Sequence, residues 1–164
     1  MAATIPPKPR AGHPLENRIP PPLVVLLLGA VMGGVAWVTP DVAVGTVPRY
    51  AVGGALVLLG LLVLTLGFGA FGRAKTAIDP VNIGRASALV TGGVFRYSRN
   101  PMYIGLAIML VGWAVCLASP WALVGPVAFV VFTARFQIIP EERAMTTKFG
   151  REYADYQARV RRWL

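Results

Sequence analysis

The chain has 164 residues, enough for one domain, and it is 55% hydrophobic but only 14% charged. Soluble domains carry about 25% charged residues, so this composition excludes an ordinary soluble domain. The formal net charge is +9, and the basic residues flank long apolar runs. That pattern suits a membrane surface and not a nucleic acid partner. The single cysteine, Cys116, excludes an intramolecular disulfide.

Residues 1–22 are proline-rich and basic, which predicts a cytoplasmic tail. A signal peptide is the alternative, because basic residues precede an apolar run. Against it, no clear cleavage site with small residues follows, and the apolar run continues as far as Pro40.

Two runs without Asp, Glu, Lys or Arg, 19–40 and 50–72, each have the length of one membrane span. We expect helices over residues 23–38 and 50–71. Glycines within both helices predict close packing against neighbours. They are Gly29, Gly33 and Gly34 in the first helix, and Gly53, Gly54, Gly60, Gly67 and Gly69 in the second.

A third uncharged run covers residues 100–134, which is too long for one span. Ser119 and Pro120 near its middle predict a turn, because proline removes a backbone donor and restricts the residue before it. The run is therefore expected to form a hairpin of two helices, 102–117 and 121–139.

The predicted fold is an all-α integral membrane protein with four transmembrane helices. Its domain of residues 23–140 would contain a cytoplasmic loop, 73–101. The tail holds three Lys or Arg, the loop five and the segment from residue 135 seven, whereas the opposite loops hold Arg49 alone. This asymmetry predicts that both termini are cytoplasmic.

The segment 141–164 has apolar residues at spacings of three or four, with basic residues between them. This pattern predicts an amphipathic helix on an anionic membrane face, with a possible break at Gly150. Its apolar positions are Met145, Phe149, Tyr153, Tyr156, Val160 and Trp163.

Polar residues gather at 96–105 and 140–143, which the predicted topology places on one membrane face. Asn100 and Pro101 suit a capped helix start with arginines at the headgroups. A ligand site is the alternative, because Tyr97 and Tyr103 offer aromatic surfaces with polar tips.

Glu141 and Glu142 also have two interpretations. Acidic residues complement the dipole in a first helical turn. Two adjacent carboxylates at a membrane boundary equally require a cationic partner, which would be Arg96, Arg99, Arg135 or a cationic ligand.

The runs 89–105 (LVTGGVFRYSRNPMYIG), 140–143 (PEER) and 149–156 (FGREYADY) resemble, in order and spacing, the superfamily of isoprenylcysteine carboxyl methyltransferases and phospholipid methyltransferases. The resemblance implies S-adenosylmethionine as cofactor, a lipophilic acceptor from the bilayer and no metal. It implies a cofactor site on both polar segments. The residues that would bind the cofactor are Val90, Gly93, Tyr97, Arg99, Asn100, Pro101, Tyr103, Glu141 and Glu142. Of these, Glu142 and Arg99 would be catalytic. Between the two glutamates, Glu142 is preferred as the cofactor contact.

Isoprenylcysteine enzymes typically have His at the position of Asn100 and Arg at the position of Gln137. The resemblance therefore implies the methyl donor more firmly than the acceptor, which is a lipid amine or a prenyl-type carboxylate or thiol. The Arg-Asn-Pro form of residues 99–101 resembles bacterial members of the superfamily, which implies a bacterial inner membrane. Two alternatives remain open from the residues. One is a membrane reductase of the sterol-reductase type that uses NADPH, and the other is a small helical membrane protein without enzymatic activity.

Overall fold

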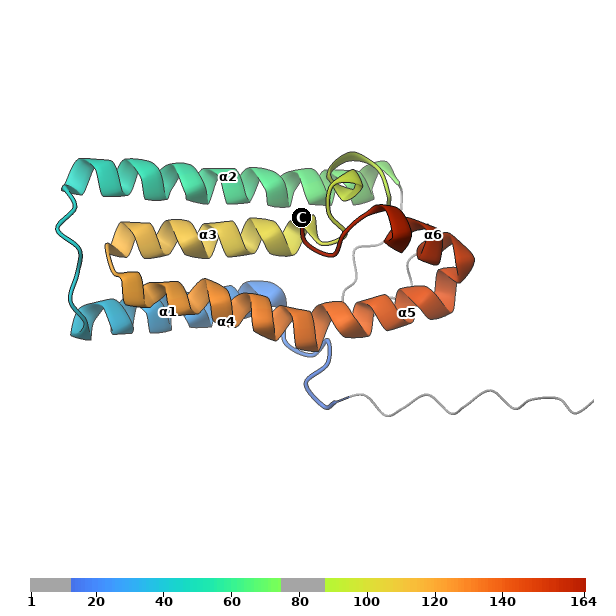
Figure 1. Cartoon of the computed structure of the whole chain (residues 1–164), viewed down its shortest axis with the longest axis horizontal. Helices are drawn as coiled ribbons and strands as arrows, with labels where there is room; N and C mark the ends of the chain where they lie inside the picture. The colour runs from blue at the N-terminus through green and yellow to red at the C-terminus, as the bar shows by residue number, and fades with distance from the viewer. Residues whose placement is uncertain (1–12, 75–87) are drawn as a thin grey trace, which may run out of the picture.

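The computed structural model describes residues 13–74 and 88–164, and within them the chain is helical and has no strand (Figure 1). Residues 1–12 of the predicted tail 1–22 and residues 75–87 of the predicted loop 73–101 lie outside the described residues. The helices are α1 (Pro21–Val38), α2 (Thr46–Arg73), the 3₁₀ helix η2 (Gly93–Arg96), α3 (Pro101–Leu117), the 3₁₀ helix η3 (Pro120–Leu123), α4 (Val124–Thr133), the π-helix η4 (Ala134–Ile138), α5 (Ile139–Phe149) and α6 (Arg151–Arg159).

Three helices of the described chain are long and apolar enough to cross a membrane: α1, α2 and the continuous helix from η3 to α5. Helix α3 is apolar but has 17 residues, at the lower limit for a span. Large apolar side chains are exposed along the helices, including Leu26, Leu58 and Val131. Such surfaces suit contact with lipid and not with water.

Glycines bring α2 and α3 into backbone contact. A Cβ atom on Gly60 would lie 2.5 Å from the Gly105 carbonyl oxygen, and one on Gly112 would lie 2.7 Å from the Gly53 oxygen. The predicted close packing is therefore confirmed for Gly53, Gly60 and Gly67 of α2, but not for Gly54, which meets nothing within 4 Å, or for Gly69, which meets only Arg73 of its own helix. It is wrong for α1 among the described residues, since a Cβ on Gly29, Gly33 or Gly34 would meet nothing within 4 Å.

The predicted hairpin is confirmed. Helix α3 ends at Leu117, Ala118 follows with a left-handed φ of 52°, and Ser119 is extended before Pro120 opens η3. Helix α1 packs against α3 and α4, where Met32 and Phe129 are fully buried. Figure 1 shows α3 between α2 on one side and the pair α1 and α4 on the other.

Pro140 lies inside a continuous helix, whereas the sequence predicted separate helices over residues 121–139 and 141–164. Proline has no N–H and its ring clashes with the carbonyl of the residue four before it. The preceding π-helix widens the backbone locally, and the Ile139 N–H bonds to the Ala134 oxygen, five residues back. The helix thereby continues from the membrane into the polar end of the molecule.

The C-terminal segment is not one helix. Gly150 adopts a φ of 50° between α5 and α6, as its position suggested, and the helix ends at Arg159. Residues 160–164 leave the helix and return to the end of the bundle, against the start of α3 (Figure 1). The backbone hydrogen bond from Arg99 N to the Arg161 oxygen, 3.0 Å long, fixes this return.

Candidate active site

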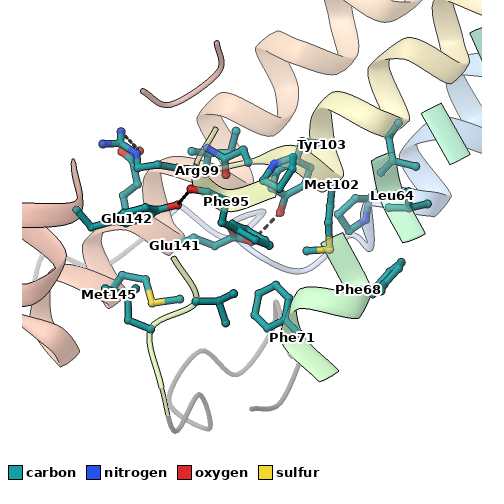
Figure 2. Close-up of a pocket in the computed structure, with 18 of the residues that line it drawn as sticks. Leu64, Phe68, Phe71, Phe95, Arg99, Met102, Tyr103, Glu141, Glu142 and Met145 are labelled. Atoms are coloured by element: carbon teal, nitrogen blue, oxygen red, sulfur yellow. Dashed lines mark hydrogen bonds and ion pairs between the residues drawn. The ribbon is translucent and has the colours of Figure 1, made fainter. Parts of the chain in front are cut away.

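A cavity of about 450 Å³ lies at the end of the bundle where α2, α3, α5 and α6 meet (Figure 2). Its walls are apolar toward the membrane helices, with Leu64, Phe68 and Phe71 from α2 and Met102 from α3. Its other end is polar. Arg99, Asn100, Tyr103, Glu141, Glu142, Tyr153 and Tyr156 line it there.

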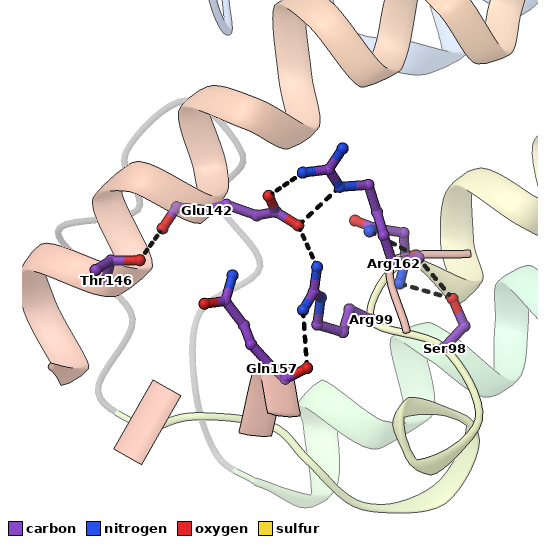
Figure 3. Close-up of polar contacts among 7 residues, drawn as sticks. Ser98, Arg99, Glu142, Thr146, Gln157 and Arg162 are labelled. Carbon is purple, nitrogen blue, oxygen red and sulfur yellow. Dashed lines mark hydrogen bonds and ion pairs between the residues drawn. The ribbon is translucent and has the colours of Figure 1, made fainter. Parts of the chain in front are cut away.

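Glu142 is clamped by two guanidinium groups (Figure 3). Arg99 Nη2 donates to its Oε1 at 2.7 Å, while Arg162 donates through Nη2 to Oε2 at 2.6 Å and through Nε to Oε1 at 3.0 Å. These hydrogen bonds raise the pKa of Arg162 above its ordinary value. The cationic partner expected for the acidic pair is thus Arg99, joined by Arg162, whereas Arg135 pairs with Glu16.

Asn100 holds the C-terminal segment in place. Its Nδ2 donates to the Arg162 carbonyl oxygen at 2.9 Å, and Ser98 Oγ donates to the same oxygen at 3.2 Å. Asn100 precedes the first residue of α3, but its side chain does not cap that helix, because it is engaged with Arg162. The hydrogen bond from Asn100 fixes the backbone of Arg162, and this places the Arg162 guanidinium beside Glu142.

The Glu141 side chain has a different partner from that of Glu142. The Tyr103 hydroxyl donates to its Oε1 at 2.6 Å, and this is its one side-chain hydrogen bond within the described residues. Figure 2 shows this hydrogen bond as a dashed line between Tyr103 and Glu141. Glu142 is therefore neutralised by arginines, whereas Glu141 keeps an acceptor for a cationic group.

Tyr153 and Tyr156 of α6 close the cavity from the C-terminal side. Both are buried, and the Tyr156 hydroxyl donates to the Phe95 carbonyl oxygen at 2.8 Å. Burial, together with the nearby Glu142 charge, raises the pKa of Tyr153 to about 12. Both phenols stay protonated near neutral pH, so they offer hydrogen-bond donors and aromatic faces and no charge.

The structure brings most of the predicted site residues to one cavity. Those that line it are Val90, Arg99, Asn100, Pro101, Tyr103, Glu141 and Glu142. Gly93 and Tyr97 do not line it. Gly93 opens η2 with a φ of 62°, a conformation that favours glycine, and Tyr97 is 77% exposed.

The sequence interpretation missed Arg162, Ser98 and the apolar residues contributed by α2. The one signal for Arg162 was its place in a basic segment, which was assigned to the membrane surface. No group of three or more His, Cys, Asp or Glu side chains that would hold a metal ion occurs in residues 13–74 and 88–164.

A family profile described as phospholipid methyltransferase matches residues 48–152, which include both polar segments and most of the cavity lining. This chain belongs to the phospholipid methyltransferase family. The match begins within α2 and ends at residue 152, the second residue of α6, so it covers α3 and α5, whereas Tyr153 and Tyr156 lie just beyond it.

Two relatives of this phospholipid methyltransferase family member carry the names of methyltransferases. A probable protein-S-isoprenylcysteine O-methyltransferase of Oryza sativa subsp. indica is 34% identical over 112 residues, 66% of this chain and 57% of that protein. Protein-S-isoprenylcysteine O-methyltransferase A of Arabidopsis thaliana is 35% identical over 108 residues, 64% of this chain and 53% of that protein. The chain thus spans somewhat more than half the length of these two relatives. An uncharacterized protein of Haemophilus influenzae is 40% identical over 63 residues, 38% of this chain and all of that protein.

Proposed function

We propose that the chain is an integral membrane methyltransferase that uses S-adenosylmethionine and acts on a lipophilic acceptor. The observation that carries the proposal is the cavity itself, which joins an apolar end on α2 to a polar end with Arg99 and Glu141. A methyl donor with charged groups suits the polar end, and a lipid-like acceptor suits the apolar end.

The polar end fits the charged groups of the cofactor. Arg99 Nε is buried and has no hydrogen-bond partner within the described residues, so it has a donor available for a carboxylate. Glu141 would hold the amino group, because its hydrogen bond to Tyr103 leaves acceptor capacity. The aromatic faces of Tyr153 and Tyr156 would suit an adenine or a nearby cation.

This assignment gives the two glutamates different roles. Glu142 would position Arg99, since it accepts hydrogen bonds from Arg99 and Arg162. Glu141 would be the direct contact of the cofactor, in contrast to the preference for Glu142 that the sequence alone suggested.

The chemistry of the walls favours an acceptor that needs no strong base. S-adenosylmethionine, when bound, supplies a methyl group on a cationic sulfur, and transfer to a carboxylate or thiolate removes both charges. The apolar side chains of Phe68, Phe71 and Met102 would exclude water, which favours a step that loses charge. Arg99 and Glu141 would contribute by holding the reacting groups in line. An amine acceptor would require a base, and Glu142 is engaged by two guanidiniums.

We further propose four spans with the cavity at the cytoplasmic face of a bacterial inner membrane. Helix α3, with 17 residues, would be about 25 Å long and would cross as a short span beside α2. The basic residues at the tail, the loop after α2 and the C-terminal segment support this orientation.

The named relatives favour this function over the two alternatives left by the sequence. The relatives from rice and Arabidopsis carry methyltransferase names, and the family profile describes methyltransferases. An NADPH-dependent reductase and a protein without enzymatic activity are both less consistent with these comparisons.

A transfer assay tests the proposal. The protein is reconstituted in vesicles with S-adenosylmethionine labelled on the methyl group, and with either N-acetyl-S-farnesylcysteine or phosphatidylethanolamine as acceptor. We expect label in the farnesylcysteine ester, strongly reduced in Glu141→Gln and retained in Glu152→Gln, which removes an exposed charge on α6. Label in phosphatidylethanolamine alone would show that the acceptor is a lipid amine and not a prenyl-type carboxylate. Label in neither compound would refute both acceptors.

A further inference from the structure

Residues 13–20 form a segment, here called the N-terminal strap, that is docked beside the site on η4 and α5. Its turn is closed by a hydrogen bond from Glu16 N to the His13 oxygen, 2.9 Å long. The His13 ring lies against Phe136 with centroids 5.3 Å apart. The proposed function assigns no role to this strap.

Proline chemistry creates one of the docking points. In a regular α-helix the Phe136 carbonyl would accept from the N–H of residue 140, but Pro140 has none. The Asn17 N–H donates to that carbonyl at 3.0 Å instead. Asn17 takes a left-handed φ of 56° to do so, a conformation that asparagine tolerates.

Side chains fasten the strap on both sides of this point. Glu16 Oε1 accepts from Arg143 at 2.8 Å and from Arg135 at 3.1 Å, and its side chain is only 13% exposed. Gln137, which is buried in η4, donates through Nε2 to the Ile19 oxygen at 2.8 Å. Ion pairs with exposed arginines stabilise little individually, so the docking depends on the whole set of contacts.

The strap leads directly into a wall of the cavity. Pro20, Pro21 and Pro22 line the cavity and begin α1. The Pro20 oxygen accepts from the Leu23 N–H at 2.9 Å and from the Val24 N–H at 3.3 Å. The three prolines have no N–H with which to hold themselves against the bundle, so the anchoring contacts before them are made by the strap.

We propose that the N-terminal strap, docked through Glu16, holds the proline wall of the cavity and thereby positions the lipophilic acceptor. Glu16 is a positioning residue in this view, since it touches Arg135 and Arg143 and not the cavity. The part concerning the acceptor rests on the proposed function. The docking and its effect on the proline wall do not depend on it.

Hydrogen exchange of the full chain in detergent tests the docking, with Glu16→Gln compared to Glu152→Gln, which removes the same charge from exposed α6. We expect exchange at the Asn17, Leu23 and Val24 amides to rise about tenfold in Glu16→Gln, equivalent to about 1.4 kcal/mol, and to stay unchanged in Glu152→Gln. Gln137→Met, which removes the other side-chain anchor with similar volume, should act in the same direction.

The same variants are assayed for methyl transfer with N-acetyl-S-farnesylcysteine. We expect Glu16→Gln to raise the apparent KM for the acceptor about tenfold, with the affinity for S-adenosylmethionine within twofold of the wild type. Unchanged exchange at Leu23 and Val24 in Glu16→Gln would overturn the strap proposal. Raised exchange with an unchanged acceptor KM would overturn its role in acceptor binding. An inactive wild type would count against the proposed function, and the exchange data would still decide the docking.

Discussion

Replacing Glu142 with glutamine removes the charge that holds two arginines together at the end of the bundle. Three hydrogen bonds converge on this carboxylate, of 2.7, 3.0 and 2.6 Å. Glutamine has the same shape but one oxygen and no charge, so one guanidinium would lose its acceptor and both would repel each other.

The magnitude follows from the exposure of the partners. The side chains of Arg99 and Glu142 are 12% and 14% exposed, while that of Arg162 is 40% exposed. Removing one partner of a buried ion pair costs about 3–5 kcal/mol, and a pair at an exposed site contributes about 0–1 kcal/mol. Because one arginine is buried and the other is partly solvated, we expect Glu142→Gln to lower the free energy of unfolding by about 2–3 kcal/mol.

Thermal unfolding in detergent measures this loss, followed by circular dichroism at constant protein and detergent concentration. We expect the midpoint to fall by about 5–10 °C in Glu142→Gln, and by less than about 2 °C in Glu141→Gln and Glu152→Gln. Equal shifts in Glu141→Gln and Glu142→Gln would refute the division of roles between the two carboxylates.

Three further predictions concern the packing and the site. Gly60→Ala should lower the unfolding midpoint, because overpacking costs about 1–3 kcal/mol. Gly54→Ala should not lower it, because a Cβ at Gly54 meets nothing within 4 Å, and equal midpoints in the two variants would contradict the α2–α3 contact. Asn100→Asp should weaken S-adenosylmethionine binding more than Asn100→Ala, since a carboxylate would face the Arg162 carbonyl. The reverse order in calorimetry would argue against the positioning of Arg162 by Asn100. Tyr103→Phe should leave Glu141 without its hydrogen-bond donor and weaken binding of S-adenosylmethionine severalfold, with little change in the unfolding midpoint. An unchanged affinity would contradict the assignment of Glu141 as the cofactor contact.

The helices were predictable because their signals are local. Charge-free runs located α1 and α2, and the Ser119-Pro120 pair located the hairpin. The sequence interpretation failed where a residue acts through a distant partner. It separated the helix 121–139 from the segment 141–164 at Pro140, because the π-helix that accommodates proline inside a continuous helix has no sequence signature of its own.

The site was predictable in its members more than in their roles. The family resemblance of the two polar segments implied Arg99, Asn100 and the glutamates as site residues, and all of them line the cavity. The roles of the two glutamates depend on residues 160–164. Their return to the bundle could not be predicted, because the pattern of this segment is typical of an amphipathic helix. Once Arg162 occupies Glu142, the neighbouring Glu141 becomes the better candidate for a cationic ligand.

Calorimetric titration of the detergent-solubilised protein with S-adenosylmethionine and with NADPH tests the central claim most directly. We expect saturable heat with S-adenosylmethionine and none with NADPH. In Glu141→Gln the affinity for S-adenosylmethionine should fall about 10- to 100-fold, because a hydrogen bond to a charged group contributes about 1.5–3 kcal/mol. Saturable binding of NADPH alone, or of neither compound, would contradict the account.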